Sequence, residues 1–600
     1  MEAGTEVPRT GSKTIADLVG LAAERYGDSP AIRHKVDGAW VDGAWVDVSF
    51  AELGEIASEI TRGLIDLGIE KGDRVALLGN TRAEWTFSDF GITSTGAVVV
   101  PIYPTNAAEE CHWVVSDSGA KAVVCENAEQ VAKIRAVQDR LPDLQHVIVM
   151  IPGGDTGDAI TLDALRERGR ALDPAVATER AASVSPDDPY TFMYTSGTTG
   201  NPKGCVLLHR NYHSVLDMVL QRGLFDEDRS DVTYLFLPLA HAFALIILLA
   251  STEAGTTIAY FGGDTKQIIG EIGEVKPTYL PSVPRIFEKI YTLVTSHAPA
   301  DLVAKAVAVG TKVRALQAAG EPVPAELQAG FDEADEKLFK NVQAAFGGRL
   351  REAVTGAAPI AREILEFFWA CGIPVMEGYG MTETSTVATS SRPDDHRFGT
   401  VGRALPGVEI RIADDGEILI KGPNIFHGYW HNADASFGAV EDGWLHTGDV
   451  GSLDEDGYLS ITGRKKDIII TAGGKNLTPA NLENDMKQCR WVSQAVMHGD
   501  RRSFPVMLIT LDEEEIVPWA EAQGLTTDVS ALAERDDVRA LVQAHLDASN
   551  AKYAQVEQVK KFFILDHDLS QETGELTPTL KVKRNVVNEK YAGRFDDLYA

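Results

Sequence analysis

A loop rich in glycine and hydroxyl residues carries the clearest chemical signal in this sequence. It spans Tyr194–Gly204 and reads Tyr-Thr-Ser-Gly-Thr-Thr-Gly-Asn-Pro-Lys-Gly, overlapping the end of a strand-like run that begins at Tyr190. Glycines let a backbone approach phosphate oxygens closely, and hydroxyl and backbone N–H groups donate hydrogen bonds to them. Lysine adds a compact positive charge. The pattern predicts phosphate binding by Thr195, Ser196, Gly197, Thr198, Thr199, Gly200 and Lys203.

The order of residues separates this loop from a Walker A motif. That motif requires G-x-x-x-x-G-K-[ST], whereas here Pro202 precedes Lys203 and Gly204 follows it. A plain surface loop is the alternative reading, because clusters of Gly, Ser and Thr are common between elements. The length and density of this cluster favour a phosphate loop of another kind.

Three further segments contain residues suited to nucleotide chemistry. In Gly378–Thr384, a tyrosine beside glycines can lay its ring against a flat base, and Glu383 can hold a hard divalent cation. In Asp442–Asp449, a carboxylate at the end of a strand can accept hydrogen bonds from both ribose hydroxyls. In Gly574–Arg584, a lysine can neutralise charge that builds up on a phosphate under attack.

These segments resemble, in content and in order, the adenylate-forming superfamily of acyl- and aryl-CoA synthetases, luciferases and peptide-synthetase adenylation domains. The resemblance extends over nearly the whole chain. It implies that the loop at Tyr194–Gly204 holds the β- and γ-phosphates of ATP. It further implies that Tyr379 lies near adenine, that Thr382 contacts the α-phosphate, and that Glu383 binds Mg²⁺.

The same resemblance assigns residues around the adenosine. Thr355–Pro359 is similar to the family's adenine-flanking loop, and its small residues Gly356, Ala357 and Ala358 leave room for a planar base. Asp449 takes the ribose-binding position, and Arg464 adds a second contact to the ribose. The run from Asp442 to Lys466 resembles the signature of fatty-acyl-CoA synthetases, although many members have Asp-Arg where this chain has Gly463-Arg464.

Resemblance also assigns roles near the C-terminal end of the sequence. Lys581 aligns with the catalytic lysine, because Thr579-Leu580 stands where Ser-Gly usually stands, and Lys583 is the competing candidate. Lys466 takes the position of the hinge about which the C-terminal domain rotates. Gly473 and Gly474 resemble the loop that shapes the CoA channel, and a plain glycine turn is the alternative there.

Three features of the sequence bear on the acyl substrate. His241 aligns with a residue near the substrate carboxylate, and a core histidine satisfied by backbone bonds is an equal alternative. The wholly apolar run Ala244–Leu249 suits an acyl tunnel, since each buried methylene contributes about 0.8 kcal/mol. Pro281–Lys289 resembles a segment typical of long-chain members.

We therefore expect an ATP-dependent ligase that converts a long-chain fatty acid to acyl-AMP and then to acyl-CoA, with Mg²⁺ as cofactor and CoA as co-substrate. The alternatives are a CoA ligase for medium-chain, aryl or steroid acids, an acyl-AMP ligase that serves a carrier protein, and a non-catalytic lipid-binding protein.

Composition limits partners and location. The formal charge of −32 argues against a nucleic-acid partner. Five cysteines without a C-x-x-C pair, and a first segment that lacks the pattern of a secretory signal, favour the cytoplasm. The most apolar run, Leu235–Ala250, is too short for a membrane span and reads as a buried strand leading into a core helix. Peripheral contact with a membrane and a homodimer both remain compatible with the sequence.

The elements that must position these residues form an α/β pattern. Short β-branched runs alternate with helical stretches between about residues 70 and 470, which predicts mainly parallel sheets covered on both faces. The runs are 75–78, 97–101, 121–125, 146–150, 232–236, 257–260 and 351–354. After Pro406, short alternating strands predict a small β subdomain.

A charged break at Gly463–Asp467 predicts the domain boundary. We expect an N-terminal adenylation domain over residues 1–465 and a smaller, mobile α+β domain over residues 466–600. Two features receive no chemical assignment. They are the tandem Val-Asp-Gly-Ala-Trp repeat at 36–45 and the Ala-, Glu- and Lys-rich helical stretch at 300–342.

Overall fold

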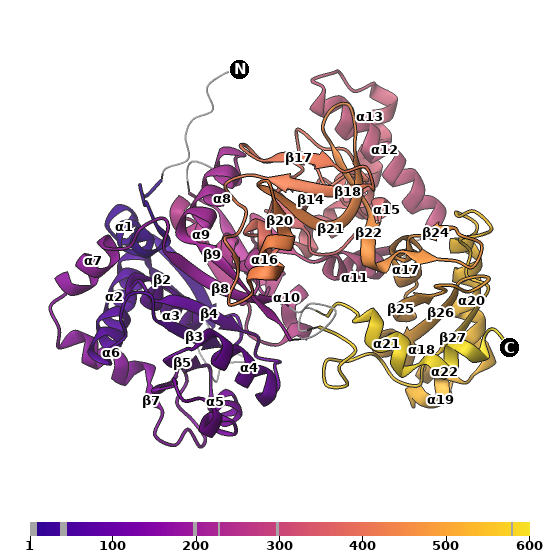
Figure 1. The fold of residues 1–600 in the computed structure, drawn as a ribbon. Helices are drawn as coiled ribbons and strands as arrows, with labels where there is room; N and C mark the ends of the chain where they lie inside the picture. The colour runs from indigo at the N-terminus through magenta and orange to yellow at the C-terminus, as the bar shows by residue number, and fades with distance from the viewer. Residues whose placement is uncertain (1–8, 36–44, 196–200, 226–228, 296–298, 578–579) are drawn as a thin grey trace.

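The fold is described from a computed structural model, which covers residues 9–35, 45–195, 201–225, 229–295, 299–577 and 580–600 (Figure 1). Two large sheets form the body of the molecule, a smaller sheet adjoins them, and a C-terminal α+β unit follows. This is the α/β class that the alternating pattern predicts. Nearly all of the tandem repeat at 36–45 lies outside the described residues.

The first sheet has eight strands in the order β19-β9-β8-β4-β3-β5-β6-β7. From β8 to β7 neighbouring strands are parallel, while β9 runs antiparallel to β8 and β19 antiparallel to β9. The bounds are β3 Arg74–Leu78, β4 Val98–Ile102, β5 Ala122–Cys125, β6 His146–Val149, β7 Ile160–Thr161, β8 Pro189–Thr195, β9 Lys203–Leu208 and β19 Gly428–Tyr429.

Both faces of this sheet are buried, as an apolar parallel strand requires. In β3, Val75 and Leu77 belong to one hydrophobic cluster, whereas Ala76 and Leu78 belong to the cluster on the opposite face. The helices around the sheet are α1 Ile15–Tyr26, α2 Phe50–Asp66, α3 Ala83–Ser94, α4 Ala108–Ser118, α5 Ala128–Arg135, η1 Gln138–Arg140, α6 Leu162–Arg170 and α7 Ala175–Ala182.

The second sheet has nine strands in the order β16-β15-β14-β13-β12-β10-β11-β1-β2. Strands β14 to β1 are parallel along this order, and the outer strands are antiparallel. The bounds are β1 Pro30–Lys35, β2 Trp45–Ser49, β10 Val232–Leu235, β11 Thr257–Tyr260, β12 Tyr279–Ser282, β13 Glu352–Thr355, β14 Val375–Tyr379, β15 Thr389–Ser390 and β16 Arg403–Ala404.

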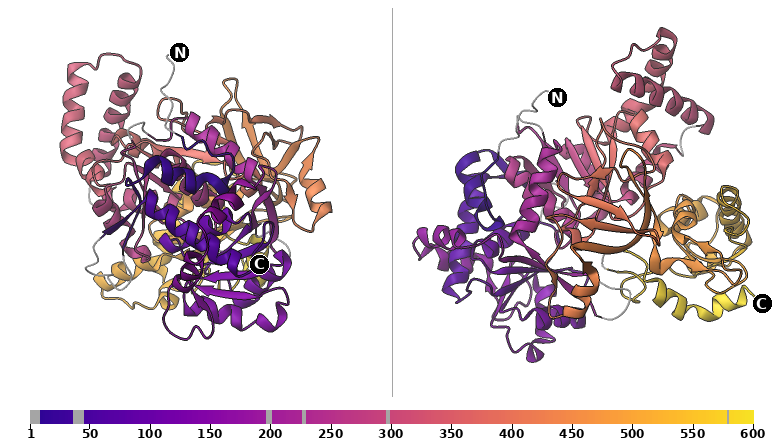
Figure 2. Two further views of the ribbon diagram at one scale, coloured as in Figure 1. Left: turned by 90° about the vertical axis from the view of Figure 1, so that its left-hand side faces the viewer. Right: turned by 45° about the horizontal axis from the view of Figure 1, so that its top comes forward.

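Helices of this part include the predicted 300–342 stretch, whose helices α12 and α13 extend away from the sheet at one end of the molecule (Figure 2). The bounds are α8 His209–Gln221, α9 Ala242–Ala254, η2 Thr265–Gln267, α10 Ile268–Val275, α11 Pro284–Thr295, α12 Ala300–Ala318, α13 Ala325–Ala334, the π-helical η3 Asp335–Phe339, α14 Lys340–Ala345, α15 Arg362–Ala370 and η4 Thr382–Thr384.

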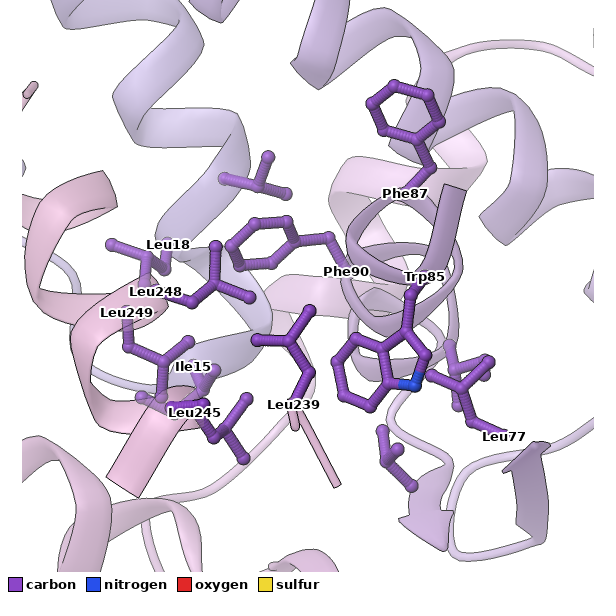
Figure 3. Packing of buried hydrophobic residues seen from close by; sticks show 14 of the residues in the cluster. Ile15, Leu18, Leu77, Trp85, Phe87, Phe90, Leu239, Leu245, Leu248 and Leu249 are labelled. Carbon is purple, nitrogen blue, oxygen red and sulfur yellow. The ribbon is translucent and has the colours of Figure 1, made fainter. Parts of the chain in front are cut away.

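The largest core lies where α1, α3 and α9 meet between the two sheets. Leu245, Leu248 and Leu249 of α9 pack with Ile15 and Trp85 of the other two helices (Figure 3). The apolar run from Leu235 therefore forms the end of β10 and the buried helix α9, as the sequence predicts. Within the described residues, no helix combines the length and the apolar character that a membrane crossing needs.

The small β subdomain is an antiparallel sheet after Pro406. Its bounds are β17 Glu409–Ile412, β18 Glu417–Lys421, β20 Val440–Glu441, β21 Trp444–Leu453 and β22 Leu459–Arg464, with α16 Ala433–Ala439 beside it. Strand β22 ends at Arg464, and the short helix η5 Lys465–Asp467 follows at the predicted charged break.

The C-terminal unit is built on a mixed three-stranded sheet in the order β25-β26-β27 with a hydrophobic cluster on each face. Its strands are β23 Ile469–Ile470, β24 Asn476–Leu477, β25 Val492–His498, β26 Val506–Leu511 and β27 Lys561–Ile564. Its helices are α17 Pro479–Lys487, α18 Glu513–Ala522, α19 Val529–Ala533, α20 Asp536–Asn550, α21 Arg584–Lys590 and α22 Ala592–Asp597.

Candidate functional site

The predicted phosphate loop lies, in sequence, between β8 and β9, which pair as an antiparallel hairpin. Thr195 ends β8 and pairs directly with Lys203, which begins β9. The indole N–H of Trp113 donates to the carbonyl of Pro202 at 2.9 Å and ties the loop to α4. Ser196, Gly197, Thr198, Thr199 and Gly200 lie outside the described residues. Their predicted contacts with phosphate stay predictions.

A tyrosine that the sequence analysis did not single out connects Lys203 with Glu383. Tyr429 lies on β19, which pairs with β9, and the Lys203 ammonium sits 5.1 Å from the centroid of its ring. The Tyr429 hydroxyl donates to Glu383 Oε1 at 2.8 Å. Burial and the Glu383 charge raise the pKa of Tyr429, so the phenol stays a donor. Lysine and carboxylate thus share one aromatic neighbour.

Glu383 is the predicted metal ligand. It lies in the single turn η4, directly after Thr382, and its carbonyl accepts from the N–H of Phe426 at 2.9 Å. Mg²⁺ in phosphate-transferring sites is held by one or two carboxylates plus substrate phosphates. In the described part of the chain, no group of three or more His, Cys, Asp or Glu side chains could hold a metal by itself. One carboxylate facing the phosphate hairpin is the donor set that this binding mode uses.

Asp449 joins two strands of the site. It is 4% exposed and stands opposite Arg464 in the β21–β22 ladder. The Arg464 Nε–H donates to Asp449 Oδ1 at 2.9 Å, and the Tyr379 hydroxyl donates to Oδ2 at 2.8 Å. The three residues predicted to surround the adenosine are therefore in direct contact. Burial and the Asp449 charge raise the pKa of Tyr379 well above its usual value.

The predicted adenine-flanking loop follows β13. A Cβ added at Gly356 would meet the carbonyl oxygen of Gly378 at 3.1 Å, so the two segments approach closely here. Ala357 adopts φ 66°, and the side chains of Ala357 and Ala358 are exposed. This loop and Tyr379 are thus placed on neighbouring parallel strands, as a shared base site requires.

Glu377 is a further candidate that the sequence analysis missed. It pairs with Thr355 across β13 and β14, next to the Gly356–Gly378 contact. Burial raises the pKa of its carboxyl to about 8, so at neutral pH this group is protonated and can donate a hydrogen bond. An acidic residue inside the otherwise apolar run Val-Met-Glu-Gly-Tyr is the signal that could have identified it.

His241 is the N-cap of the apolar helix α9. Its Nδ1 accepts from the Phe243 N–H at 3.2 Å. Burial, and then the Lys581 charge, lower its pKa to about 4. The neutral imidazole therefore carries its proton on Nε2, where it can donate to an oxygen. The Thr386 hydroxyl donates to the Ala242 carbonyl at 2.8 Å and ties this cap to the segment after Glu383.

Lys581 reaches this site from the C-terminal unit. Its backbone N–H donates to Thr577 Oγ1 at 3.1 Å, and its side chain keeps contact with solvent. The charged groups that act on it are Arg464, Asp449, Glu383 and Lys466. The loss of solvation among the surrounding atoms, and then the Arg464 charge, lower its pKa to about 8.

The competing candidate, Lys583, lies at the start of α21, where its N–H donates to the Glu575 carbonyl at 2.7 Å. The Lys581 charge interacts with Asp449 and Glu383, two further residues of the predicted site. This interaction supports Lys581 as the candidate for the catalytic lysine.

The remaining predicted residues lie at the junction and beyond it. Lys466 lies in η5 and is exposed. Partial loss of solvation by the surrounding atoms is the main cause that lowers the pKa of its ammonium group, and the nearby Arg464 charge is the second. Gly473 and Gly474 form the turn between β23 and β24, where Gly474 donates to the Thr471 carbonyl at 2.8 Å. The described hydrogen bonds of this turn stay within the C-terminal unit.

Side chains from distant parts of the sequence thus meet where the C-terminal unit closes on an α/β body, an organisation that defines the adenylate-forming class. The chain belongs to the AMP-binding enzyme family. Residues 21–430 match the family model of the AMP-binding enzyme, and residues 466–600 match that of the AMP-binding enzyme C-terminal domain.

Individual relatives extend this result over the whole chain. The chain is 39% identical over 601 residues to the long-chain-fatty-acid–CoA ligase FadD15 of Mycobacterium tuberculosis, covering 97% of each protein. A solved fatty acyl CoA synthetase of Mycobacterium tuberculosis is 25% identical, with a TM-score of 0.62 over 97% of this chain and 99% of that one. The anthranilate CoA ligase AuaEII, solved with anthranoyl-AMP, has a TM-score of 0.73 at 21% identity over 98% and 99% of the chains, which shows a shared fold.

Proposed function

We propose that this protein is a long-chain fatty-acid–CoA ligase that uses Mg·ATP. The observation that carries the proposal is the 39% identity to a long-chain-fatty-acid–CoA ligase over 97% of both chains. The convergence of Lys581, Asp449 and Glu383 at one place supports it, because binding alone needs no lysine there. We assign residues 1–465 to the adenylation domain and residues 466–600 to a mobile C-terminal domain. We place the protein in the cytoplasm.

The first half-reaction joins the fatty carboxylate to the α-phosphorus of ATP. A carboxylate oxygen forms the new bond to phosphorus, and pyrophosphate leaves with the electron pair of the broken P–O bond. In-line displacement requires positioning and charge neutralisation rather than a covalent enzyme group. Lys581 and Lys203 supply positive charge to the phosphates. Mg²⁺ held by Glu383 supplies further charge neutralisation when it is bound.

Other residues orient the reactants. The His241 Nε2–H donates to an oxygen of the fatty carboxylate, and Thr382 contacts the α-phosphate. The apolar helix α9, which begins directly after His241, offers a wall for the acyl chain. Asp449 and Arg464 hold the ribose, while Tyr379, Glu377 and the Gly356–Ala358 loop surround the adenine.

The second half-reaction transfers the acyl group to CoA. The C-terminal domain turns about Lys466, which withdraws Lys581 and brings the Gly473–Gly474 turn to the pantetheine channel. The CoA thiol gives its proton to solvent, its sulfur bonds to the acyl carbon, and AMP leaves with the electrons of the acyl–oxygen bond. Hinges of this kind absorb backbone change at a few residues between elements.

The test is pyrophosphate and AMP release with Mg·ATP and acetate, octanoate, palmitate or benzoate, each with and without CoA. We expect palmitate-dependent release that turns over only with CoA and yields palmitoyl-CoA. Preference for octanoate or benzoate would identify a ligase for other acids. Pyrophosphate without thioester would identify an acyl-AMP ligase, and inactivity with every acid would favour a lipid-binding protein.

The Tyr429–Glu383 contact yields a separate prediction. Tyr429→Phe keeps the ring that faces Lys203 and removes only the hydroxyl that donates to Glu383. A hydrogen bond to a charged group contributes about 1.5–3 kcal/mol. We expect pyrophosphate release to fall by about tenfold and half-maximal activity to need more Mg²⁺.

The matched control is Tyr553→Phe, which removes a 2.8 Å bond from a phenol to the Asp485 carboxylate in the C-terminal unit. Its Mg²⁺ dependence should equal that of the wild type. An unchanged Mg²⁺ dependence in Tyr429→Phe would contradict the role given to this hydroxyl.

A further inference from the structure

Helix α11 of the body is joined to the C-terminal unit by ion pairs. The guanidinium of Arg285 donates a hydrogen bond to the Asp512 carboxylate, and the ammonium of Lys289 donates one to the Glu514 carboxylate. Asp512 is the N-cap of α18, and Glu514 lies in the first turn of that helix. Both cations come from Pro281–Lys289, the segment whose sequence suggested a long-chain substrate.

Further residues of opposite charge face each other around these two ion pairs. Lys266, on the 3₁₀ turn η2, acts on Glu514 together with Lys289 and Arg285. Glu288 of α11 interacts with Lys487 at the end of α17. The body therefore presents a cationic patch, formed by Lys266, Arg285 and Lys289, to the acidic start of α18. In the reverse sense, the acidic Glu288 of α11 faces Lys487 of the C-terminal unit. The complementarity spans two helices of the C-terminal unit.

This contact is coupled to Lys581 through the packed C-terminal sheet. Leu482 of α17 and Ile516 of α18 lie in the hydrophobic cluster on one face of the β25-β26-β27 sheet. Leu576, which bridges to Val582 just beyond Lys581, lies in the cluster on the other face. Packed interiors transmit displacement because they leave few voids. Fixing α17 and α18 against α11 consequently fixes the lysine.

The same arrangement places Lys581 among Asp449, Glu383 and His241. An ion pair that exists in one pose and not in another shifts the equilibrium between the poses by its differential free energy. Arg285 and Lys289 are each about 40% exposed, so their contacts add little to the stability of the fold itself. The same contribution, up to about 1 kcal/mol for each pair, is enough to shift an equilibrium between two poses by up to about fivefold.

We propose that Arg285 and Lys289 are positioning residues, which hold the C-terminal unit in the pose that presents Lys581 to the adenylation reaction through their pairs with Asp512 and Glu514. The inference rests on the proposed function. By this inference, the Pro281–Lys289 segment holds the C-terminal unit against the body, and this role requires no contact between the segment and the acyl chain.

The test separates the two half-reactions. Lys289→Glu, Glu514→Lys and the double variant are assayed for palmitate-dependent pyrophosphate release without CoA, and for thioester formation from supplied palmitoyl-adenylate and CoA. Each single reversal should slow pyrophosphate release by about three- to tenfold. Neither should slow thioester formation. The double variant restores opposite charges at this pair but leaves Lys266 and Arg285 facing the new lysine, so it should recover part of the pyrophosphate release that the single variants lose.

Two further variants refine the comparison. Asp512→Asn removes the charge that faces Arg285 and keeps a side chain able to cap α18, so it should act as the single reversals do. Lys337→Glu is the matched control, because it breaks an exposed pair with Glu333 inside one helical segment of the body. It should leave both half-reactions unchanged.

Equal losses in both half-reactions, or no loss in either, would overturn the positioning role. A double variant no more active than the slower single variant would overturn it as well, because the pairing of opposite charges would then not matter. Inactivity of the wild type with every acid would instead overturn the proposed function, and the positioning role with it.

Discussion

Replacing Lys581 by alanine will lower palmitate-dependent pyrophosphate release by about 10²- to 10³-fold, the usual cost of removing one group that stabilises transition-state charge. The physical reason is the placement of its ammonium among Asp449, Glu383 and Arg464, where negative charge would accumulate on the phosphates. ATP binding should change little, since Lys203 and the hairpin remain. Single-turnover pyrophosphate release and equilibrium ATP binding measure the two effects.

Lys583→Ala is the matched control for that experiment. It removes an ammonium two residues away, at the start of α21, and should retain most of the activity. Thioester formation from supplied palmitoyl-adenylate should survive in both variants, because Lys581 is withdrawn for that step. Full pyrophosphate release by Lys581→Ala, or a larger loss in Lys583→Ala, would show that the catalytic lysine has been assigned wrongly.

The pH dependence tests the same residue without a mutation. Loss of solvation and the Arg464 charge lower the pKa of Lys581 to about 8. The protonated form neutralises phosphate charge, so kcat/KM for the first half-reaction should decline as pH rises through about 8 in the free enzyme. Lys581→Arg keeps its charge at this pH and should lose that decline. A profile of the wild type that stays flat to pH 10 would contradict the placement.

Much of this fold follows from local sequence. The run at 75–78 is apolar at every position, a pattern that fits a strand buried on both faces, and it is a central strand in the structure. The glycine-rich loop can also be recognised from the sequence, because its residues are adjacent in the chain. Thr195 and Lys203, which flank this loop, lie opposite each other in the β8–β9 hairpin.

Other parts of the site depend on pairings that no local pattern contains. Tyr429 meets Glu383 only because the two-residue strand β19 joins β9 at one particular register. The Arg285–Asp512 pair likewise depends on how α11 of the body packs against the start of α18 in the C-terminal unit. For His241 the sequence left two readings open. The structure shows a cap whose Nδ1 is occupied by a backbone N–H, which leaves Nε2 available as a donor.

Asp449→Asn should raise the KM for ATP by about 10- to 100-fold, because hydrogen bonds to a charged group contribute about 1.5–3 kcal/mol. Both carboxylate oxygens are engaged, by the Tyr379 hydroxyl and by the Arg464 guanidinium. An amide offers one acceptor oxygen and turns an N–H₂ group toward one of these donors. The measurement is the ATP dependence of pyrophosphate release at saturating palmitate.

A second readout separates a role in the site from a loss of structure. The Asp449 charge raises the pKa of Lys581, opposing burial and Arg464, so its removal should move the decline of kcat/KM to lower pH. Asp456→Asn, which removes an exposed partner of Arg397, should change neither the KM nor the profile. If Asp449→Asn weakened ATP use but left the pH of the decline unchanged, the electrostatic link between Asp449 and Lys581 would be wrong.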